Sequence, residues 1–277
     1  MNQLCIIGCG LIGGSFAALV KKHHPDLAIQ GIGRRQEPLK AAQERGIIDD
    51  YALDINTSKV QTADIIVIAS PIATVLPIIS NLTATINETK TIIEFSSVKS
   101  FLNDPVVTNS HHTIIGMHPM GGLDVQGLEN AAATVLENCP MIVFNEDPIN
   151  SFIASCSFNL ISCPSYEIHD EWMMQVSHGP YILASVLPNI LSKKSNDERR
   201  QLQSISAGGF RDTTRVSNSA IEWGLDVLTG NKKNAIVFID QITHALTQLK
   251  SHLENDQQSD LSDWLTAAKT TRSTIVN

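Results

Sequence analysis

The sequence predicts an α/β fold in which a doubly wound, mostly parallel sheet is followed by an all-helical part. Two observations support this prediction. Short apolar runs alternate with helical or irregular segments up to residue 166, as they do in βαβ units. Beyond that residue the β-branched runs stop and the apolar residues take helical spacing. We therefore expect two domains, residues 1–166 and residues 167–277.

Each expected element follows from its apolar pattern. The candidate strands of the first domain are Leu4–Ile7, Ala28–Ile32, Ile65–Ala69, Thr91–Phe95, Thr113–Ile115, Met141–Phe144 and Asn159–Ser162. The candidate helices of the second domain are residues 167–193, 196–207, 220–228 and 234–253. The polar stretch from Glu254 to Asp263 is expected to be an exposed connection between helices.

Composition argues against several classes of protein. Hydrophobic residues make up 43% and charged residues 17% of the chain, as in ordinary globular proteins. The net charge of −8, without a basic cluster, argues against a nucleic-acid partner. The longest apolar stretch, residues 65–79, is interrupted by Ser70, Pro71 and Pro77, so we expect no membrane span. The five cysteines have no CxxC spacing, so we expect no metal site. No signal pattern opens the chain, and together with the cysteine pattern this leads us to expect a cytoplasmic protein.

A glycine-rich motif after the first strand predicts a dinucleotide site. Gly8-Cys9-Gly10-Leu11-Ile12-Gly13 has the GxGxxG pattern of Rossmann-type domains, placed between a strand and a helix. The glycines permit a tight turn, approach of the backbone to a pyrophosphate and close helix packing, and the helix amino terminus faces the phosphates. The expected cofactor contacts are Gly8, Gly10, Leu11, Ile12 and Gly13, together with Ser70 after a later strand.

The residues after the second strand favour NADP. The segment Gly31-Ile32-Gly33-Arg34-Arg35 has no acidic residue where a carboxylate would accept the ribose 2′-hydroxyl of NAD. Arg34 and Arg35 instead offer cations for the 2′-phosphate of NADP. Two alternatives stay open: Glu37 could reach a ribose hydroxyl and favour NAD, or the arginines could simply be solvated residues at the start of a helix.

His118 is the strongest candidate for acid–base chemistry. It lies in Gly116-Met117-His118-Pro119-Met120-Gly121-Gly122, expected to be a bend after the strand Thr113–Ile115. In open α/β sheets ligands bind outside the carboxyl ends of strands, where this bend is expected. Histidine can take a proton from an alcohol while a hydride leaves the same carbon. A histidine that only forms structural hydrogen bonds is the alternative.

Three further segments occur in a recognisable order with the glycine motif and His118. They are Ser96-Ser97-Val98-Lys99, Val176-Ser177-His178-Gly179-Pro180-Tyr181 and Gly208-Gly209-Phe210-Arg211-Asp212-Thr213-Thr214-Arg215. In this order the segments resemble those of the prephenate and arogenate dehydrogenases of tyrosine biosynthesis. The resemblance implies a Rossmann domain joined to a helical dimerisation domain, and therefore a homodimer. It also implies oxidative decarboxylation of prephenate to 4-hydroxyphenylpyruvate, or of arogenate to tyrosine.

The same resemblance implies roles for individual residues. His118 polarises or deprotonates the ring hydroxyl, and Ser97 forms hydrogen bonds with that hydroxyl and with the histidine. Arg215 holds a substrate carboxylate and His178 lines the pocket. This chemistry agrees with the reaction, which needs a base at the hydroxyl and a cation at a carboxylate and needs no metal.

The chain departs from the family at two candidate substrate residues. Tyr181 stands where many members have a second histidine, and Asp124 stands where many have a glutamate. The chain also has no room for a fused chorismate mutase or a regulatory domain, so we expect a single activity. Prephenate and arogenate differ only at a keto or amino group, and the sequence leaves that choice open.

Alternatives remain for the site and for the function. Ser97 could be a helix N-cap, His178 a core histidine, and Arg215 part of an exposed face with Arg211. A β-hydroxyacid dehydrogenase would share the domain plan, but it would have a lysine on the first interdomain helix, where residues 173–178 contain none. A protein that senses NADP without turnover is the other alternative.

Overall fold

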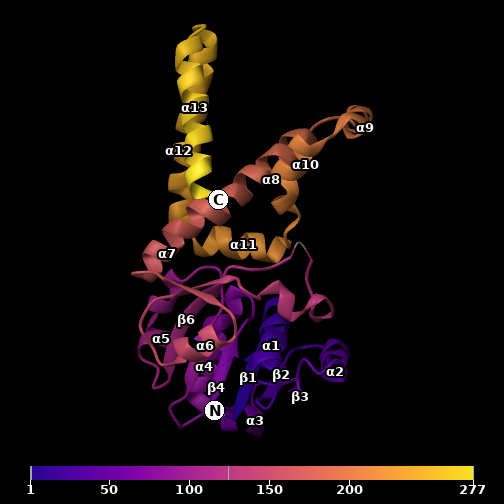
Figure 1. Ribbon diagram of the computed structural model, residues 1–277, viewed down its shortest axis with the longest axis vertical. Coiled ribbons are helices and arrows are strands. Elements are labelled where there is room, and N and C mark those ends of the chain that lie inside the picture. Colours follow the sequence, from indigo (N-terminus) through magenta and orange to yellow (C-terminus); the bar gives the residue numbers. More distant parts are fainter. Residues whose placement is uncertain (1, 124, 277) are drawn as a thin grey trace. The chain divides into compact units, whose positions relative to one another are not determined.

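The structure is a computed structural model that describes residues 2–123 and 125–276 (Figure 1). Contacts within the chain define two compact units, Met1–Lys232 and Lys233–Asn277. The first unit contains the sheet and the helices up to α11 (Ile221–Gly230). The second unit contains nearly all of α12 (Lys232–Glu254) and α13 (Gln258–Ile275). The expected domain border at residues 166 and 167 lies at the start of α7 and stays a prediction.

The first unit is built on one eight-stranded sheet with the order β3-β2-β1-β4-β5-β6-β7-β8. The strands are β1 (Gln3–Ile7), β2 (Ala28–Ile32), β3 (Asp50–Ala52), β4 (Ile65–Ile68), β5 (Thr91–Glu94), β6 (Thr113–Pro119), β7 (Pro140–Val143) and β8 (Asn159–Ser162). All neighbours pair in parallel except β6 and β7. The predicted doubly wound sheet is confirmed, because the first six strands have the order of a dinucleotide-binding fold.

Helices of the first unit connect the strands and then continue beyond the sheet. They are α1 (Leu11–His23), α2 (Gln36–Glu44), α3 (Ser58–Thr62), α4 (Ile72–Thr85), α5 (Pro105–Thr108), α6 (Ile149–Ser155), α7 (Tyr166–Met173), α8 (Gly179–Ser192), α9 (Asn196–Ile205), α10 (Gly208–Thr214) and α11. The sequence missed β3, a three-residue edge strand with no fully buried side chain. The helical character expected after residue 166 is confirmed.

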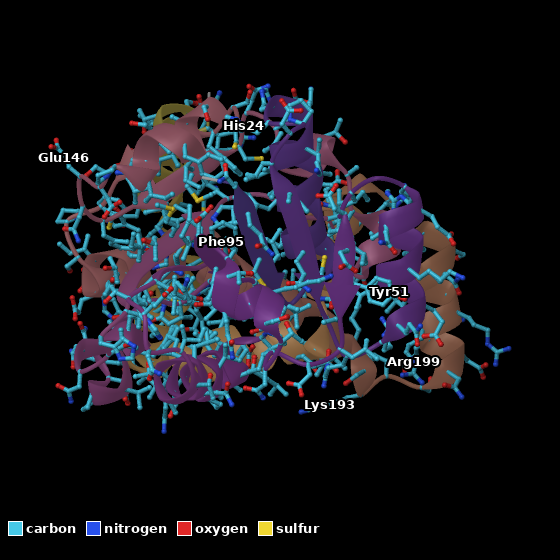
Figure 2. All side chains as sticks on the ribbon, turned by 90° about the horizontal axis from the view of Figure 1, so that it is seen from below. His24, Tyr51, Phe95, Glu146, Lys193 and Arg199 are labelled. Atoms are coloured by element: carbon cyan, nitrogen blue, oxygen red, sulfur yellow. The ribbon has the colours of Figure 1, made fainter. Side chains whose placement is uncertain are left out.

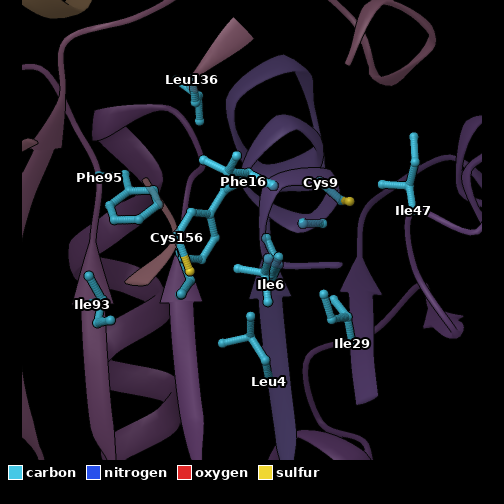
Figure 3. Close-up of a cluster of buried hydrophobic side chains, with 14 of the residues drawn as sticks. Leu4, Ile6, Cys9, Phe16, Ile29, Ile47, Ile93, Phe95, Leu136 and Cys156 are labelled. Carbon is cyan, nitrogen blue, oxygen red and sulfur yellow. The ribbon is translucent and has the colours of Figure 1, made fainter. Parts of the chain in front are cut away.

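Apolar side chains fill both faces of the sheet. On one face Phe16 of α1 meets Phe95 edge to face, with ring centroids 5.0 Å apart (Figure 3). On the other face Val75, Ile79 and Leu82 of α4 pack on the central strands. Figure 2 shows the opposite pattern at the surface, where the charged side chains of Glu146, Lys193 and Arg199 point outward. Burial on both faces holds the carboxyl ends of the parallel strands in fixed positions, and the candidate site is built there.

No helix in the described part of the chain is long and apolar enough to cross a membrane.

Candidate active site

The glycine motif forms a turn that is tightly packed on one side and open on the other. Gly8 has a φ of +89°, and a Cβ there would lie 2.7 Å from the backbone of Ala69. A Cβ on Gly13 would lie 2.5 Å from the carbonyl oxygen of Gly8, so α1 could not pack so closely with any other residue. Gly10 has no atom within 4 Å of its Cβ position. The turn therefore leaves space beside Gly10 and the amino terminus of α1, which begins at Leu11 and continues through Ile12.

Ser70 and the two arginines lie on the loops after β4 and β2, the two strands that flank β1, at the same edge of the sheet. Ser70 follows β4, its backbone N faces Gly8, and its hydroxyl accepts a 2.8 Å hydrogen bond from Thr74. Arg34 and Arg35 lie between β2 and α2, and both side chains are exposed. Neither arginine forms an ion pair with a carboxylate of the described residues. Both guanidinium groups are therefore available to an anion.

His118 lies inside strand β6 and not in a bend after it, so the expected position was wrong in detail. The strand continues to Pro119 because its last residues pair antiparallel with β7, with His118 opposite Ile142. The glycines at 121 and 122 come after the strand. The pairing fixes the backbone of His118, and the residue is only 8% exposed. A histidine on a buried strand is held more rigidly than one on a loop.

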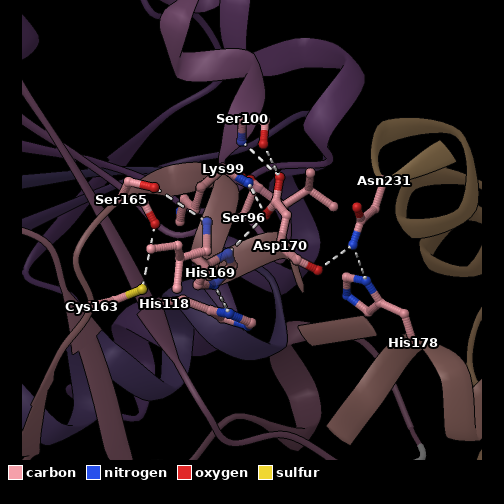
Figure 4. Close-up of polar contacts among 12 residues, drawn as sticks. Ser96, Lys99, Ser100, His118, Cys163, Ser165, His169, Asp170, His178 and Asn231 are labelled. Carbon is pink, nitrogen blue, oxygen red and sulfur yellow. Dashed lines mark hydrogen bonds and ion pairs between the residues drawn. The ribbon is translucent and has the colours of Figure 1, made fainter. Parts of the chain in front are cut away.

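A chain of hydrogen bonds leads from His118 to a carboxylate (Figure 4). His118 Nδ1 lies 2.9 Å from His169 Nε2, and His169 Nδ1 lies 2.8 Å from Asp170 Oδ1. Both His169 and Asp170 are on α7, which packs beside the loop that follows β5. Asp170 also accepts hydrogen bonds from the backbone N–H groups of Lys99 and Ser100 and from the Ser100 hydroxyl. We call His118, His169 and Asp170 the relay.

The pKa shifts keep the relay in one protonation state. Burial lowers the pKa of His118 well below its usual value, and nearby positive charge on His169, Lys99 or His178 lowers it further. Burial also lowers the pKa of His169, although Asp170 acts in the opposite direction. Burial raises the pKa of Asp170, but hydrogen bonds from His169, Ser100 and Lys99 outweigh it and leave that pKa below its usual value. At neutral pH the relay therefore has two neutral histidines and one carboxylate.

These states fix the tautomer of each histidine. A carboxylate only accepts, so His169 Nδ1 must carry the proton that bonds to Asp170. His169 Nε2 then has a lone pair and accepts from His118 Nδ1. His118 Nε2 is left without a proton and can act as a base. The relay resembles the base and orienting carboxylate of a catalytic triad, with one histidine inserted between them.

Ser97 lies in a loop that is held from both sides. On one side Glu94 and Lys99 form a fully buried ion pair, and Glu94 also accepts a hydrogen bond from the backbone N–H of Ser96. The Ser97 hydroxyl accepts a 3.2 Å hydrogen bond from the indole of Trp223 on α11. Its own O–H therefore stays available as a donor. The N-cap alternative was wrong, because the next helical turn, Ser100–Asn103, has Lys99 as its N-cap. Among the described residues Ser97 bonds to Trp223 and His118 bonds to His169, in place of the expected bond between Ser97 and His118.

His178 lies at the end of a π-helical turn, Met174–His178, that joins α7 to α8. The sequence predicted an uninterrupted helix over 167–193. The structure differs in that a π turn, with one extra residue, interrupts the α-helix there. Such turns are frequent at functional sites because they redirect side chains. His178 is fully buried, and burial is the main cause that lowers its pKa to about 4.

The remaining candidate residues lie on α8 and on the turn after α10. The Tyr181 ring meets Trp223 edge to face at 5.1 Å, and its hydroxyl occupies the space where a Cβ on Gly224 would lie, 2.2 Å away. Arg215 begins a 3-10 turn that packs against α8, and both Arg215 and Arg211 are exposed. Asp124 lies outside the described residues. No group of side chains suited to a metal ion occurs in the described segments.

Sequence reasoning missed His169, Asp170, Trp223 and Asn231. A sequence signal did exist for the first two, since His169 and Asp170 precede Met173 and Met174 by four residues and so share a buried helical face with them. Polar residues on such a face need partners. Asn231 follows α11, and its side chain lies 3.2 Å from His178 Nδ1. Nothing in the sequence pointed to that contact.

The fold and site together define the class of protein. A GxGxxG turn on a doubly wound sheet, with a neutral histidine held as a base at the carboxyl edge, is typical of dehydrogenases that use a nicotinamide dinucleotide. Models of two domains match the chain, the prephenate dehydrogenase nucleotide-binding domain over residues 16–151 and the prephenate dehydrogenase dimerization domain over residues 165–267. The protein belongs to the prephenate dehydrogenase family.

Individual relatives agree with the family models. The prephenate dehydrogenase of Lactococcus lactis is 31% identical over 90% of this chain and 70% of its own length. That of Bacillus subtilis is 29% identical over 97% of this chain and 76% of its own. A crystal structure of A. aeolicus prephenate dehydrogenase with hydroxyphenyl propionate and NAD+ has a TM-score of 0.89 and 26% identity, over 99% of this chain and 98% of that one. The Synechocystis arogenate dehydrogenase has a TM-score of 0.81 and 26% identity, over 99% and 100%.

Proposed function

We propose that the protein oxidatively decarboxylates prephenate or arogenate, with a nicotinamide dinucleotide as the hydride acceptor, in tyrosine biosynthesis. The observation that carries this proposal is the relay, which leaves His118 Nε2 as a proton acceptor at the carboxyl edge of the sheet. Relatives named prephenate, cyclohexadienyl and arogenate dehydrogenase support the substrate class.

The chain's own groups account for the chemistry as follows. The bound nicotinamide supplies the hydride acceptor. As hydride leaves the hydroxyl-bearing ring carbon, His118 Nε2 takes the hydroxyl proton and a dienone forms. The bond to the ring carboxylate then breaks, its electron pair enters the ring, and CO2 leaves. The same histidine can return its proton to the new phenol oxygen, so no net proton is consumed. Ser97, with its O–H free to donate, stabilises that oxygen during both steps.

A paired kinetic assay tests this function. Purified protein is mixed with prephenate or arogenate and with NAD+ or NADP+, and absorbance of the reduced nicotinamide is followed. At least one of the four combinations should give sustained turnover. Turnover of a β-hydroxyacid with none of the ring substrates would instead favour the alternative dehydrogenase.

We propose NADP as the preferred cofactor and NAD as the alternative, on the basis of Arg34 and Arg35. Replacing both with serine should raise the KM for NADP by about tenfold or more, because only NADP has a 2′-phosphate for a charge-assisted bond. The KM for NAD should change by less than about twofold. Initial rates with each cofactor measure this. An equal change in the KM for both cofactors would mean that the arginines are solvated surface residues and do not select NADP.

Arg215 is proposed to bind a substrate carboxylate. Arg215→Ala should raise the substrate KM about ten- to a hundred-fold, since a charge-assisted hydrogen bond of this kind is worth about 1.5–3 kcal/mol. The carboxylate is held similarly in ground and transition states, so kcat should fall less. Arg211→Ala is the matched control, because Arg211 is also exposed and lies one helical turn earlier. If Arg211→Ala raises the substrate KM and Arg215→Ala does not, Arg211 is the carboxylate-binding residue and the proposed assignment is wrong by one helical turn.

We propose that the protein is a two-fold homodimer. The second matched domain is described as a dimerization domain. Helix α8 exposes Val186, Leu187 and Ile190, α11 exposes Ile221 and Leu225, and in the second unit α12 exposes Ile236 and Ile239. So much exposed apolar surface is unusual for a monomer. Light scattering should give twice the chain mass of 30.2 kDa at micromolar concentration. A monomer mass would count against the dimer.

A further inference from the structure

Asn231 is a buried amide beside His178 that the mechanism above does not use. It is 3% exposed and comes directly after α11, whereas His178 is fully buried. Asn231 Nδ2 lies 2.7 Å from the backbone carbonyl oxygen of Asp170 and 3.2 Å from His178 Nδ1 (Figure 4). One amide group therefore joins the helix of the relay to the histidine on the π turn.

These two contacts determine which way the amide faces. A backbone carbonyl only accepts hydrogen bonds, so the amide atom nearest to Asp170 must be the NH2 group. The second hydrogen of that NH2 group is then available for His178 Nδ1, which must accept it. The pKa of His178 is lowered to about 4, chiefly by burial, so its ring is neutral near pH 7. Its single ring proton is therefore on Nε2.

The proton on His178 Nε2 has no acceptor in the described part of the chain. Nε2 is buried and has no hydrogen-bond partner there. Buried donors in proteins are nearly always paired, so an unpaired one in a site calls for an acceptor from a ligand. The Trp223 ring lies beside His178, with centroids 6.1 Å apart, and the Trp223 indole donates a hydrogen bond to the hydroxyl of Ser97. The unpaired donor therefore lies beside the residues that hold Ser97, in the candidate site.

We propose that Asn231 is a positioning residue that holds His178 as its Nε2–H tautomer, so that His178 donates a hydrogen bond to an unprotonated oxygen of the substrate. This inference rests on the proposed function. The two site histidines then have opposite roles, because His118 Nε2 accepts a proton and His178 Nε2 donates a hydrogen bond. A neutral donor can position a substrate oxygen without adding a second full positive charge to the one that Arg215 is proposed to supply at a carboxylate.

The tautomer can be measured without turnover. Protein labelled with 15N-histidine, in its full-length form, gives separate ring nitrogen shifts for the two tautomers, and His178→Gln assigns the signals. We expect wild-type His178 to carry its proton on Nε2. In Asn231→Asp the new carboxylate should accept from Nδ1 and move the proton there. A proton on Nδ1 of His178 in the wild-type protein would overturn the inference. If a variant does not fold, the wild-type spectrum alone decides the tautomer.

Kinetics separate positioning from a purely structural role. Asn231→Ala should lower kcat/KM for the ring substrate about tenfold in the wild-type background. In the His178→Gln background the same change should cost less than about twofold, because the histidine that it orients is gone. Equal losses in both backgrounds would mean that Asn231 acts through the Asp170 carbonyl, which contradicts the proposal. A wild type that turns over neither prephenate nor arogenate refutes the proposed function, while the nitrogen spectrum still tests the tautomer.

Discussion

His118→Asn should lower kcat by about a hundred- to ten-thousand-fold, because proton transfer to a positioned base is worth that much and an amide cannot accept the proton. The Kd for the dinucleotide should stay within about threefold, since the glycine turn is on other strands of the sheet. Steady-state kinetics and cofactor titration by fluorescence measure the two effects. His244→Asn is the matched control, because His244 is an exposed histidine on α12.

The pH dependence of wild-type kcat/KM checks the same assignment. The base works only when neutral, and burial lowers the pKa of His118 well below its usual value. Activity should therefore be retained as the pH falls through 6.5 and be lost only at more acidic pH. This acid limb should be absent from the residual activity of His118→Asn. Survival of kcat within a few-fold in that variant would make His118 a structural residue.

Asp170→Asn should lower kcat by a similar factor, about a hundred-fold or more, although Asp170 does not contact the substrate. If the new NH2 group faces His169 Nδ1, it donates there and moves the His169 proton to Nε2. The bond to His118 then reverses, and His118 Nε2 carries a proton and cannot act as a base. If the amide is instead rotated by 180°, its NH2 group faces the backbone N–H of Ser100. Two donors then face each other without an acceptor, so this orientation is disfavoured.

Ser100→Ala provides the comparison for Asp170→Asn. It removes one donor from the Asp170 carboxylate and leaves the charge and the His169 contact in place. We expect it to lower kcat by less than about tenfold. The thermal unfolding of both variants identifies any loss of the folded state. A folded Asp170→Asn protein with kcat within about threefold of the wild type would show that the relay does not set the state of His118.

The sequence predicted the fold well because the relevant signals are local. A GxGxxG motif between a strand and a helix, and the change from β-branched runs to helical spacing, each involve neighbouring residues. The position of His118 was less accurate, because β6 is lengthened by pairing with β7, which begins 21 residues after it ends. A pairing of that kind depends on the register of another segment, which periodicity does not contain.

The polar network of the site was the part that sequence reasoning could not supply. His118 and His169 are 51 residues apart, and Asn231 and His178 are 53 apart. Both contacts depend on how α7 and α11 pack at the edge of the sheet. The sequence alone therefore indicated His118 as the candidate base, whereas the structure identified the groups bonded to it.

The most direct test measures three products in one reaction. Wild-type protein is supplied with prephenate or arogenate and with an excess of the preferred cofactor, and reduced nicotinamide, CO2 and the aromatic product are quantified together. Oxidative decarboxylation predicts the three in equal amounts, with 4-hydroxyphenylpyruvate from prephenate or tyrosine from arogenate. Reduced nicotinamide without matching CO2, or no reduction with either substrate and either cofactor, would contradict the proposed function.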